Sequence, residues 1–466
     1  MKETATRNKS QSDTITAIAT APGRGGVGIV RVSGSKAHEI AGKILKKIPH
    51  PGEYLYSDFL RPDQSCIDSG LALWFENPQS FTGEDVLELQ GHGGPVVMGM
   101  LLDQVLSHGA RLAKPGEFTE RAFLNNKLDL AEAEAVADLI NAQSQEAAKS
   151  ALKSLQGAFS KEIHDLVEQL IKLRLYVEAA IDFPEEEIDF LTDSHVLKDS
   201  EKLLENLKTL LSNARRGELL QTGINLVIAG RPNAGKSSLL NALSGKDSAI
   251  VTDIPGTTRD VLKESIAIDG VPLHIFDTAG IRVTENLIEQ EGVKRAFKAI
   301  SQADRILLVI DFLDLADIEK IRQEILENIP ESISGSIPVS YVINKIDKKI
   351  NQLQNKNQVN SPYQNLLMIS AKTGEGLDLL KKHLLACVGL DQGQETLFSA
   401  RKRHLVSIEQ AMNYLNQAIS QLKHHQAGEL FAEDCRLAQE ALNQITGEFT
   451  SDDLLGRIFS SFCIGK

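Results

Sequence analysis

Paired cysteines, long apolar runs and an excess of positive charge are all missing from this chain of 466 residues. Its four cysteines, Cys66, Cys387, Cys435 and Cys463, include no Cys-x-x-Cys pair, which argues against a disulfide framework or a zinc site and fits a reduced cytosol. No apolar run approaches the roughly 20 residues that cross a membrane, and the polar residues 1–13 lack the apolar core of a signal peptide. We therefore expect a cytoplasmic protein without a membrane segment.

The charge balance excludes a general attraction to nucleic acid. Lys and Arg number 50 against 63 Asp and Glu, which gives a formal net charge of −13. Any contact with RNA therefore needs a local basic face or a partner protein. Hydrophobic residues make up 42% of the chain and indicate a folded protein. Its length suits about three domains at roughly 150 residues per domain.

A complete phosphate-binding loop lies in the middle of the chain. Residues 230–238 read Gly-Arg-Pro-Asn-Ala-Gly-Lys-Ser-Ser, between an apolar strand pattern at 224–229 and helical spacing of apolar residues at 238–243. The backbone amides of such a loop converge on phosphate oxygens at a helix N-terminus, where the macrodipole adds positive potential. We expect Lys236 to neutralise the β- and γ-phosphates and Ser237 to offer its hydroxyl to Mg²⁺.

Three further motifs follow apolar strand patterns in the order that GTPases use. Residues 277–280 (Asp-Thr-Ala-Gly) predict a second switch, while 344–347 (Asn-Lys-Ile-Asp) and 370–372 (Ser-Ala-Lys) predict loops that read the base. The Asp347 carboxylate can accept from the ring N–H and the amine of guanine, and the Ala371 amide can donate to the guanine carbonyl. A site built to pair polar groups rejects an analogue that leaves them unpaired, so we expect selectivity for GTP over ATP.

The first switch should lie between the phosphate loop and Asp277. Residues 252–260 read Thr-Asp-Ile-Pro-Gly-Thr-Thr-Arg-Asp, with adjacent hydroxyls after a glycine, and Thr258 is the predicted second protein ligand to Mg²⁺. Gly280 is followed by Ile281, an alkyl side chain that cannot orient the attacking water. The residues alone leave four side chains open for that role, which are Arg282, Glu285, Glu289 and Glu291.

These motifs define one predicted GTP site. Its members are Asn233, Ala234, Gly235, Lys236, Ser237 and Ser238, then Thr252, Asp253, Ile254, Pro255, Gly256, Thr257 and Thr258, then Asp277, Thr278, Ala279 and Gly280, and finally Asn344, Lys345, Asp347, Ser370, Ala371 and Lys372. Asp277 would reach the metal through water, and Gly280 would meet the γ-phosphate.

Helical patterns flank the GTPase motifs on both sides. Apolar side chains recur in steps of three and four at about 130–181, at 197–211 and at 405–422, whereas the first 120 or so residues show strand-like alternation broken by glycine-rich turns. The economical arrangement is a multidomain protein in which a Ras-like α/β P-loop GTPase domain interrupts one discontinuous α-helical domain. The predicted domains are an α+β domain at 1–127, helical halves at 128–221 and 388–466, and the GTPase domain at 222–387.

Short motifs along nearly the whole chain resemble those of one family, the bacterial and organellar tRNA-modification GTPases MnmE, also called TrmE. They are residues 22–28 with Arg31, then 80–84, 91–94, 115–118, 127–130 and the final Cys-Ile-Gly-Lys at 463–466. The resemblance implies a homodimer that joins an FAD-dependent flavoprotein, MnmG or GidA, in a heterotetramer or larger complex. It implies addition of an aminomethyl or carboxymethylaminomethyl group to carbon 5 of the wobble uridine of certain tRNAs, with a tetrahydrofolate derivative as one-carbon donor.

The same resemblance implies roles for individual residues. Folate would contact Arg31, Glu88, Lys127 and Lys466, with Cys463 nearby as a candidate catalytic thiol. Glu289 would orient the attacking water. Potassium would stabilise the developing charge in place of an arginine finger. Its implied ligands are Asn233, Thr252, Ile254 and Thr257. GTP and potassium would order the first switch and bring two GTPase domains together.

Two other interpretations stay open. A regulatory GTPase in ribosome assembly or RNA binding, without covalent chemistry, would carry a basic module after the GTPase domain, but the segment after Lys372 is mixed in charge. A folate-binding scaffold that only recruits the flavoprotein would show tRNA modification indifferent to GTP hydrolysis.

Overall fold

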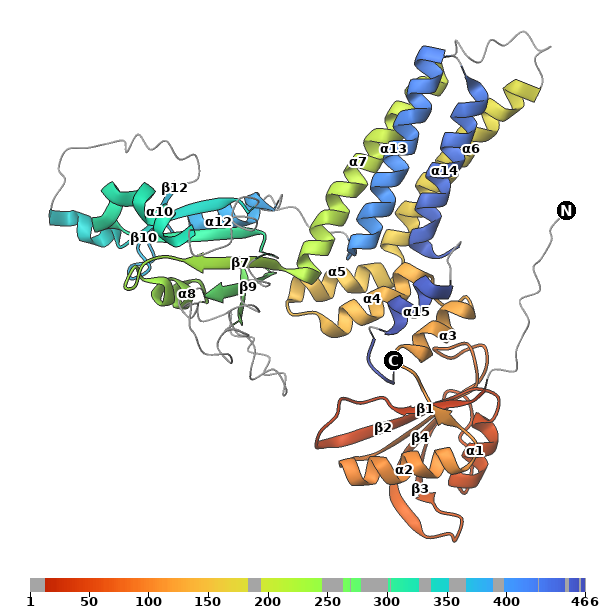
Figure 1. Cartoon of the computed structure of the whole chain (residues 1–466). Helices are drawn as coiled ribbons and strands as arrows, with labels where there is room; N and C mark the ends of the chain where they lie inside the picture. Colours follow the sequence, from red (N-terminus) through yellow and green to blue (C-terminus); the bar gives the residue numbers. More distant parts are fainter. Residues whose placement is uncertain are drawn as a thin grey trace, which may run out of the picture. The chain divides into compact units, whose positions relative to one another are not determined.

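The computed structural model describes residues 13–182, 194–244, 263–268, 270–277, 301, 303–326, 337–351, 366–388, 398–425, 427–448, 452–460 and 462–465 (Figure 1). Contacts between residues divide the chain into two compact units. The first unit comprises Met1–Ala137, Leu155–Leu203 and Gln410–Lys466, and the second comprises Asp138–Ser154 and Leu204–Glu409.

The first unit contains a six-stranded sheet in the order β3-β4-β5-β2-β1-β6. Its strands are β1 (Ile15–Ile18), β2 (Gly25–Ser33), β3 (Tyr54–Leu60), β4 (Cys66–Phe75), β5 (Val86–Gly93) and β6 (Arg111–Leu112). Neighbours are antiparallel except β1 and β6, which run parallel. Helices α1 (Ala37–Ile44) and α2 (Pro95–Ser107) share one buried core with inward-facing residues such as Val30 and Leu89. Because side chains alternate along a strand, Arg31 and Glu88 belong to the other face of the sheet.

Helices complete the first unit. They are α3 (Glu117–Leu124), the start of α4 (Leu130–Asn141), α6 (Ala158–Asp182), the start of α7 (Ser194–Thr222), most of α13 (Lys402–His425), α14 (Gly428–Thr446) and α15 (Asp452–Ser460). Helix α6 packs along α14. Apolar residues of α4 form a second core with Phe459 of α15 and with Phe462 beyond it.

The apolar pattern predicted at about 130–181 is not one continuous helix. The structure divides it into α4, α5 (Gln145–Leu155) and α6. Gly157 has a φ of +84°, a left-handed conformation that ends one helix and starts another. Residues of α6 such as Phe159, Ile163 and Leu170 are buried, as the apolar spacing predicts, whereas Leu152 in α5 is 44% exposed.

The second unit contains a six-stranded sheet in the order β12-β11-β10-β7-β9-β8. Its strands are β7 (Ile224–Ala229), β8 (Lys263–Ile268), β9 (Val271–Asp277), β10 (Arg305–Asp311), β11 (Val339–Asn344) and β12 (Leu366–Met368). All neighbours are parallel except β8 and β9, which form an antiparallel hairpin. Among its described residues, the helical segments are α8 (Lys236–Ser244), the short η2 (Phe312–Asp317), α10 (Ile318–Leu326), η3 (Ile346–Asn351) and α12 (Leu377–Cys387), together with the end of α4, nearly all of α5 (Gln145–Leu155), most of α7 and the start of α13.

Both faces of this sheet are covered by helices. Leu226 and Ile228 of β7 belong to a core with residues of α8 and α12, whereas Val227 and Ala229 belong to a core with Ile321 of α10. A strand that is buried on both faces reads as a continuous apolar run, as β7 does. The arrangement is a doubly wound α/β sheet, whose ligand sites lie beyond the carboxyl ends of the strands.

The predicted fold classes are confirmed. The chain combines an α+β domain, a discontinuous helical domain and an α/β P-loop domain, although the boundaries at residues 127, 221 and 387 stay predictions. Within the described part of the chain, no helix is both long enough and apolar enough to span a membrane.

Candidate functional site

The phosphate loop joins the carboxyl end of β7 to the start of α8 in the second unit. Gly235 has a φ of +94°, and a Cβ on it would lie 2.3 Å from the Nδ2 atom of Asn344. A residue with a side chain therefore cannot replace this glycine without displacing Asn344. Lys236 is buried, and its ammonium donates to the carbonyl oxygens of Gly230 at 2.8 Å and Arg231 at 3.1 Å. Ser237 and Ser238 are exposed in the first turn of α8.

Asn344 connects this loop to both predicted base-reading loops. Its side chain is buried, and its Nδ2 donates to the Ala234 carbonyl at 3.0 Å. Its Oδ1 accepts from the backbone N–H of Lys345 at 2.8 Å and of Ala371 at 3.0 Å. The Ala371 amide, which we expect to donate to guanine, therefore donates to Asn344 in this structure.

The predicted guanine-reading carboxylate is oriented by the last motif. The buried Ser370 hydroxyl donates to the Oδ1 of Asp347 at 2.7 Å and also accepts from the backbone N–H of Thr373 at 3.2 Å. Lys372 follows on the exposed side of the same turn. The two base loops are thus fixed to each other through side chains as well as through the adjacent strands β11 and β12.

One residue of this site escaped sequence reasoning. Asp311 ends β10, opposite Asn344 in the register of β10 and β11. It accepts from the Lys345 ammonium at 2.7 Å, and the same ammonium donates to the Asn233 carbonyl. Burial opposes ionisation of Asp311, but the hydrogen bonds from Lys345 and the Leu313 backbone, together with the charges of Lys345 and Lys348, outweigh it and lower the pKa of this carboxyl. An acid directly after the apolar run of β10 is the signal that points to it.

Several predicted site residues lie outside the described part of the chain. They are Thr252, Asp253, Ile254, Pro255, Gly256, Thr257 and Thr258 of the first switch, Thr278, Ala279 and Gly280 of the second, Glu289, and the terminal Lys466.

Asp277 is the last residue of β9 and lies opposite Ile228 in the register with β7. The end of β9 therefore lies at the same sheet edge as the phosphate loop. Asn233 has a φ of +64° at the exposed tip of that loop.

In the first unit, the structure brings two of the predicted folate residues together. Arg31 of β2 lies directly opposite Glu88 of β5, and its Nε donates to the Glu88 carboxylate at 2.8 Å. The Arg31 guanidinium also lies 5.7 Å from the centre of the Phe118 ring and donates to the Gly465 carbonyl at 3.4 Å. The penultimate glycine of the sequence thus contacts the central strand of the N-terminal sheet.

Gly465 fits closely against β1. Its φ is +95°, and a Cβ there would lie 2.6 Å from the carbonyl oxygen of Ile18. Two residues earlier, the Cys463 carbonyl accepts from the backbone N–H of Gly116 at 3.3 Å, while the residue itself is exposed. Lys127 is separate from this group, because its ammonium donates to the Pro78 carbonyl at 3.0 Å.

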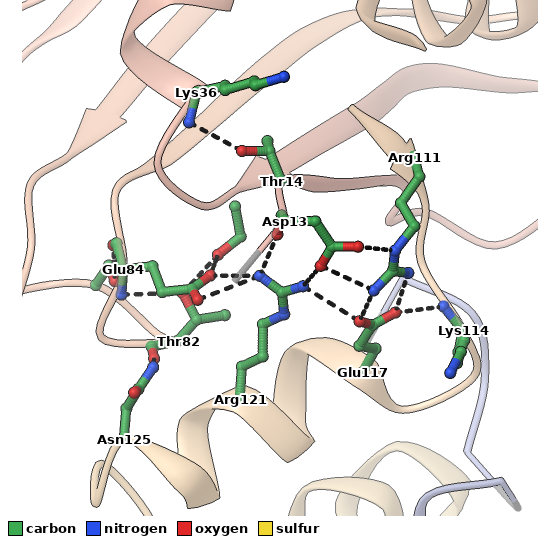
Figure 2. Close-up of polar contacts among 12 residues, drawn as sticks. Asp13, Thr14, Lys36, Thr82, Glu84, Arg111, Lys114, Glu117, Arg121 and Asn125 are labelled. Carbon is green, nitrogen blue, oxygen red and sulfur yellow. Dashed lines mark hydrogen bonds and ion pairs between the residues drawn. The ribbon is translucent and has the colours of Figure 1, made fainter. Parts of the chain in front are cut away.

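Glu84 and Glu117, from the motifs at 80–84 and 115–118, belong to a partly buried ionic cluster (Figure 2). Arg121 of α3, only 8% exposed, donates to Glu84 at 3.0 Å, to Asp13 at 3.0 Å and to Glu117 at 3.2 Å. Arg111 of β6 also donates to Glu117, at 2.8 Å, and to Asp13. We call these five residues the Arg121 cluster.

The Arg121 cluster lowers the pKa of two of its acids, Glu117 and Asp13. Burial opposes ionisation of Glu117, yet the hydrogen bonds from Arg111 and the Lys114 backbone, together with the charges of Arg111 and Arg121, outweigh it and lower the pKa of the carboxyl. The hydrogen bond from Arg111 likewise lowers the pKa of Asp13 and is its main cause. Ser33 donates to the Glu84 carboxylate at 2.7 Å, so the cluster ties β2 and β6 to α3. We therefore assign it to stability.

Two known protein families match this chain, and together they cover nearly all of it. The family described as MnmE helical domain matches residues 130–463, and the family described as GTP-binding protein TrmE N-terminus matches residues 14–127. A tRNA modification GTPase MnmE of Hydrogenovibrio crunogenus is 57% identical over 98% of this chain and 99% of its own length. One of Saccharophagus degradans is 58% identical, with the same coverage. The G domain of the T. maritima FeoB iron transporter is 26% identical over 35% of this chain and 98% of that chain, with a TM-score of 0.24.

Proposed function

The chain belongs to the MnmE family of tRNA-modification GTPases, and from that premise we propose the reaction that its GTPase activity serves. It acts with an FAD-carrying flavoprotein partner, MnmG (GidA), in a heterotetramer or larger complex. Together they add an aminomethyl or carboxymethylaminomethyl group to carbon 5 of the wobble uridine of certain tRNAs. The chain functions as a homodimer in the cytoplasm.

The observation that carries the GTPase part of the proposal is the position of Asn344. One buried amide links the phosphate loop at Ala234 to both base loops, at Lys345 and Ala371. Binding of phosphates and recognition of guanine are therefore mechanically joined. Lys236 presents its ammonium over the phosphate loop, and the Asp347 carboxylate, held by Ser370, accepts from guanine.

Metal ions complete the hydrolytic site in this proposal. Ser237, exposed at the start of α8, and Thr258 hold Mg²⁺, which neutralises charge on the β- and γ-phosphates when bound. Asn233 at the exposed loop tip, with Thr252, Ile254 and Thr257, holds potassium. Glu289 orients the attacking water. Potassium favours association of two GTPase domains, and hydrolysis releases them.

The first unit binds the tetrahydrofolate derivative through Arg31 and Glu88, with Lys127 and Lys466. The support is chemical, because a guanidinium donor and a carboxylate acceptor lie side by side next to the Phe118 ring. When bound, the folate supplies the one-carbon unit. Cys463 is exposed two residues before the glycine that contacts Arg31, and we propose that its thiol participates in the reaction.

Mass analysis of wobble nucleosides tests the function directly. Cells without this protein should lose the modified uridine, and the wild-type chain should restore it. Lys236→Ala should not restore it, whereas Lys382→Ala, an exposed lysine of α12 in the same unit, should. Full restoration by Lys236→Ala would leave the chain as a folate-binding scaffold.

Two further experiments test the roles proposed for potassium and for the Cys463 thiol. GTP hydrolysis should be faster in potassium than in sodium at equal ionic strength, and equal rates would remove potassium from the mechanism. Cys463→Ser should hydrolyse GTP normally and fail to restore the modified uridine. Full restoration by that variant would exclude the thiol from the chemistry.

A further inference from the structure

The β8–β9 hairpin of the second unit connects the two predicted switches. The first-switch residues 252–258 precede β8, and residues 278–280 follow β9. The strands pair from Lys263 opposite Phe276 to Ile268 opposite Val271, so the turn that contains Gly270 forms the closed end. Because β8 and β9 are paired along their whole length, we take them to move together against β7, so that a displacement at the open end also moves the turn.

The closed end of this hairpin rests on the start of α5. A Cβ on Gly270 would lie 2.5 Å from Oε2 and 2.6 Å from Cγ of Glu146, and the φ of +83° at Gly270 also favours glycine. Ala147 is fully buried in the same core as Ile266, Ile268 and Val271 of the hairpin. No side chain fits between the turn and the helix without displacing one of them.

The end of α7 fixes the hairpin from a second direction. Gln221 donates to the Ala147 carbonyl at 3.5 Å, and the His274 ring lies 3.1 Å from the Thr222 carbonyl. A Cβ on Gly223 would lie 2.6 Å from the Pro272 carbonyl. Ser144 caps the start of α5 by accepting from the Ala147 backbone N–H at 3.1 Å. The start of α5 therefore has a defined position against the hairpin.

The far end of α5 holds the chain as it leaves the GTPase domain. Buried Ser154 accepts from the backbone N–H of Ser399 at 2.8 Å. The preceding helix contributes Asp138, whose Oδ1 accepts from Arg401 at 2.7 Å and whose Oδ2 accepts from Ser399 at 3.3 Å. Residues 398–401 lead directly into α13. One helix thus contacts the hairpin at its start and the entry to α13 at its end.

We propose that α5 is a strut that transmits movement of the β8–β9 hairpin to residues 398–401, with Glu146 and Ala147 as positioning residues at the hairpin end. The inference deepens the proposed function, because it names the route by which nucleotide state reaches the helices. An α-helix rises about 1.5 Å per residue, so α5 spans about 16 Å without an intervening loop. A rigid element with packed contacts at both ends is the physical basis for such coupling.

Hydrogen exchange on the full chain tests the strut without a substitution. The chain is compared with GDP and with GDP plus aluminium fluoride, each with Mg²⁺ and potassium. Amides of the hairpin, of α5 and of residues 398–404 should change their exchange rates together, while those of α2 in the first unit serve as the reference. A changed hairpin with unchanged α5 amides overturns the proposal, and so does an unchanged hairpin.

Ala147→Leu then tests the contact itself. The larger side chain should separate turn and helix, so tRNA modification should fall about tenfold while the rate of GTP hydrolysis stays within about twofold. Lys149→Leu adds the same side chain at an exposed position two residues along α5 and should leave both rates unchanged. Ala147→Ser keeps the volume small and should retain modification.

These measurements separate the strut from the proposed function. If wild-type chain hydrolyses GTP and restores the modified uridine, but Ala147→Leu does so equally well, the strut is wrong and the function stands. If wild-type chain fails to restore the uridine, the proposed function is wrong, and the exchange comparison still decides the strut.

Discussion

The loops around Asn344 and the Arg121 cluster both gather buried polar groups, but they use them differently. Asn344 forms its hydrogen bonds with backbone groups of three loops, and the motif side chains Ser237 and Lys372 are exposed. Arg121 forms ion pairs with three carboxylates, two of which it shares with Arg111. A buried amide can therefore shape a binding site, whereas a cluster of ion pairs stabilises the domain that contains it. Substitutions in the two regions should separate stability from binding.

The largest effect is expected for Arg121→Ala. Removal of Arg121 leaves the buried Glu84 carboxylate without its ion-pair partner and leaves Glu117 with Arg111 alone, which should destabilise the first unit by about 3–5 kcal/mol. Urea unfolding followed by fluorescence measures this well, because Trp74, the one tryptophan in the chain, is buried in β4 of that unit. Arg24→Ala, an exposed control, should change stability by at most about 0.5 kcal/mol. Equal stability of Arg121→Ala and wild type would contradict a structural role for the cluster.

Asn344→Ala, in the second unit, should weaken nucleotide binding and leave the stability of the first unit unchanged. The substitution leaves two backbone amides and one carbonyl without their partner, so GDP affinity should fall about 30-fold, or about 2 kcal/mol. Titration calorimetry with GDP measures the loss, and the Trp74 unfolding curve should not move. Asn416→Ala on α13, where the amide bonds only its own helix at Met412, is the matched control. Unchanged GDP affinity would mean that the three loops hold their positions without this amide.

Arg31→Ala tests whether the first unit also contains a binding surface distinct from its ionic cluster. Loss of a charge-assisted donor should weaken binding of a tetrahydrofolate derivative about tenfold, without the large destabilisation of Arg121→Ala. Equilibrium dialysis with the folate gives the affinity. Arg61→Ala, at the end of β3 in the same sheet, should bind as wild type. Equal affinities for wild type and Arg31→Ala would move the folate site elsewhere.

The smallest effect concerns acid stability. Because the folded-state pKa values of Glu117 and Asp13 are lowered, their ion pairs contribute fully above the ordinary carboxyl pKa and lose that contribution as pH falls through the lowered values. Urea midpoints of the first unit between about pH 3 and pH 6 should therefore decline on acidification, and less steeply in Glu117→Gln. A parallel decline in both proteins would assign the acid sensitivity to other groups.

Sequence reasoning performed best where chemistry fixes spacing. A phosphate loop needs its glycines, lysine and serine at set positions, so residues 230–238 and the parallel sheet around them were predictable. Packing partners distant in sequence were not. Nothing local indicates that Asp311 pairs with Lys345, or that the motif acids Glu84 and Glu117 converge on Arg121, because three-dimensional proximity alone brings them together.

The helix boundaries show the same limit. Apolar spacing from 130 to 181 stays compatible with one long helix, but the structure breaks it twice, and a left-handed glycine, Gly157, marks the break between α5 and α6. Pattern alone does not reveal whether a glycine in a helical run adopts that conformation, since glycine is also tolerated inside helices at a cost of about 1 kcal/mol.

The contact between Arg31 and Gly465 joins residues 434 positions apart in the chain. Translation proceeds at about 5–20 residues per second, so residue 465 leaves the ribosome roughly 20 to 90 seconds after residue 31. For all that time a nascent polypeptide carries an N-terminal sheet whose central arginine has not met Gly465. The Arg31 contact therefore forms only after the GTP-binding sequence at residues 230–372 has been synthesised.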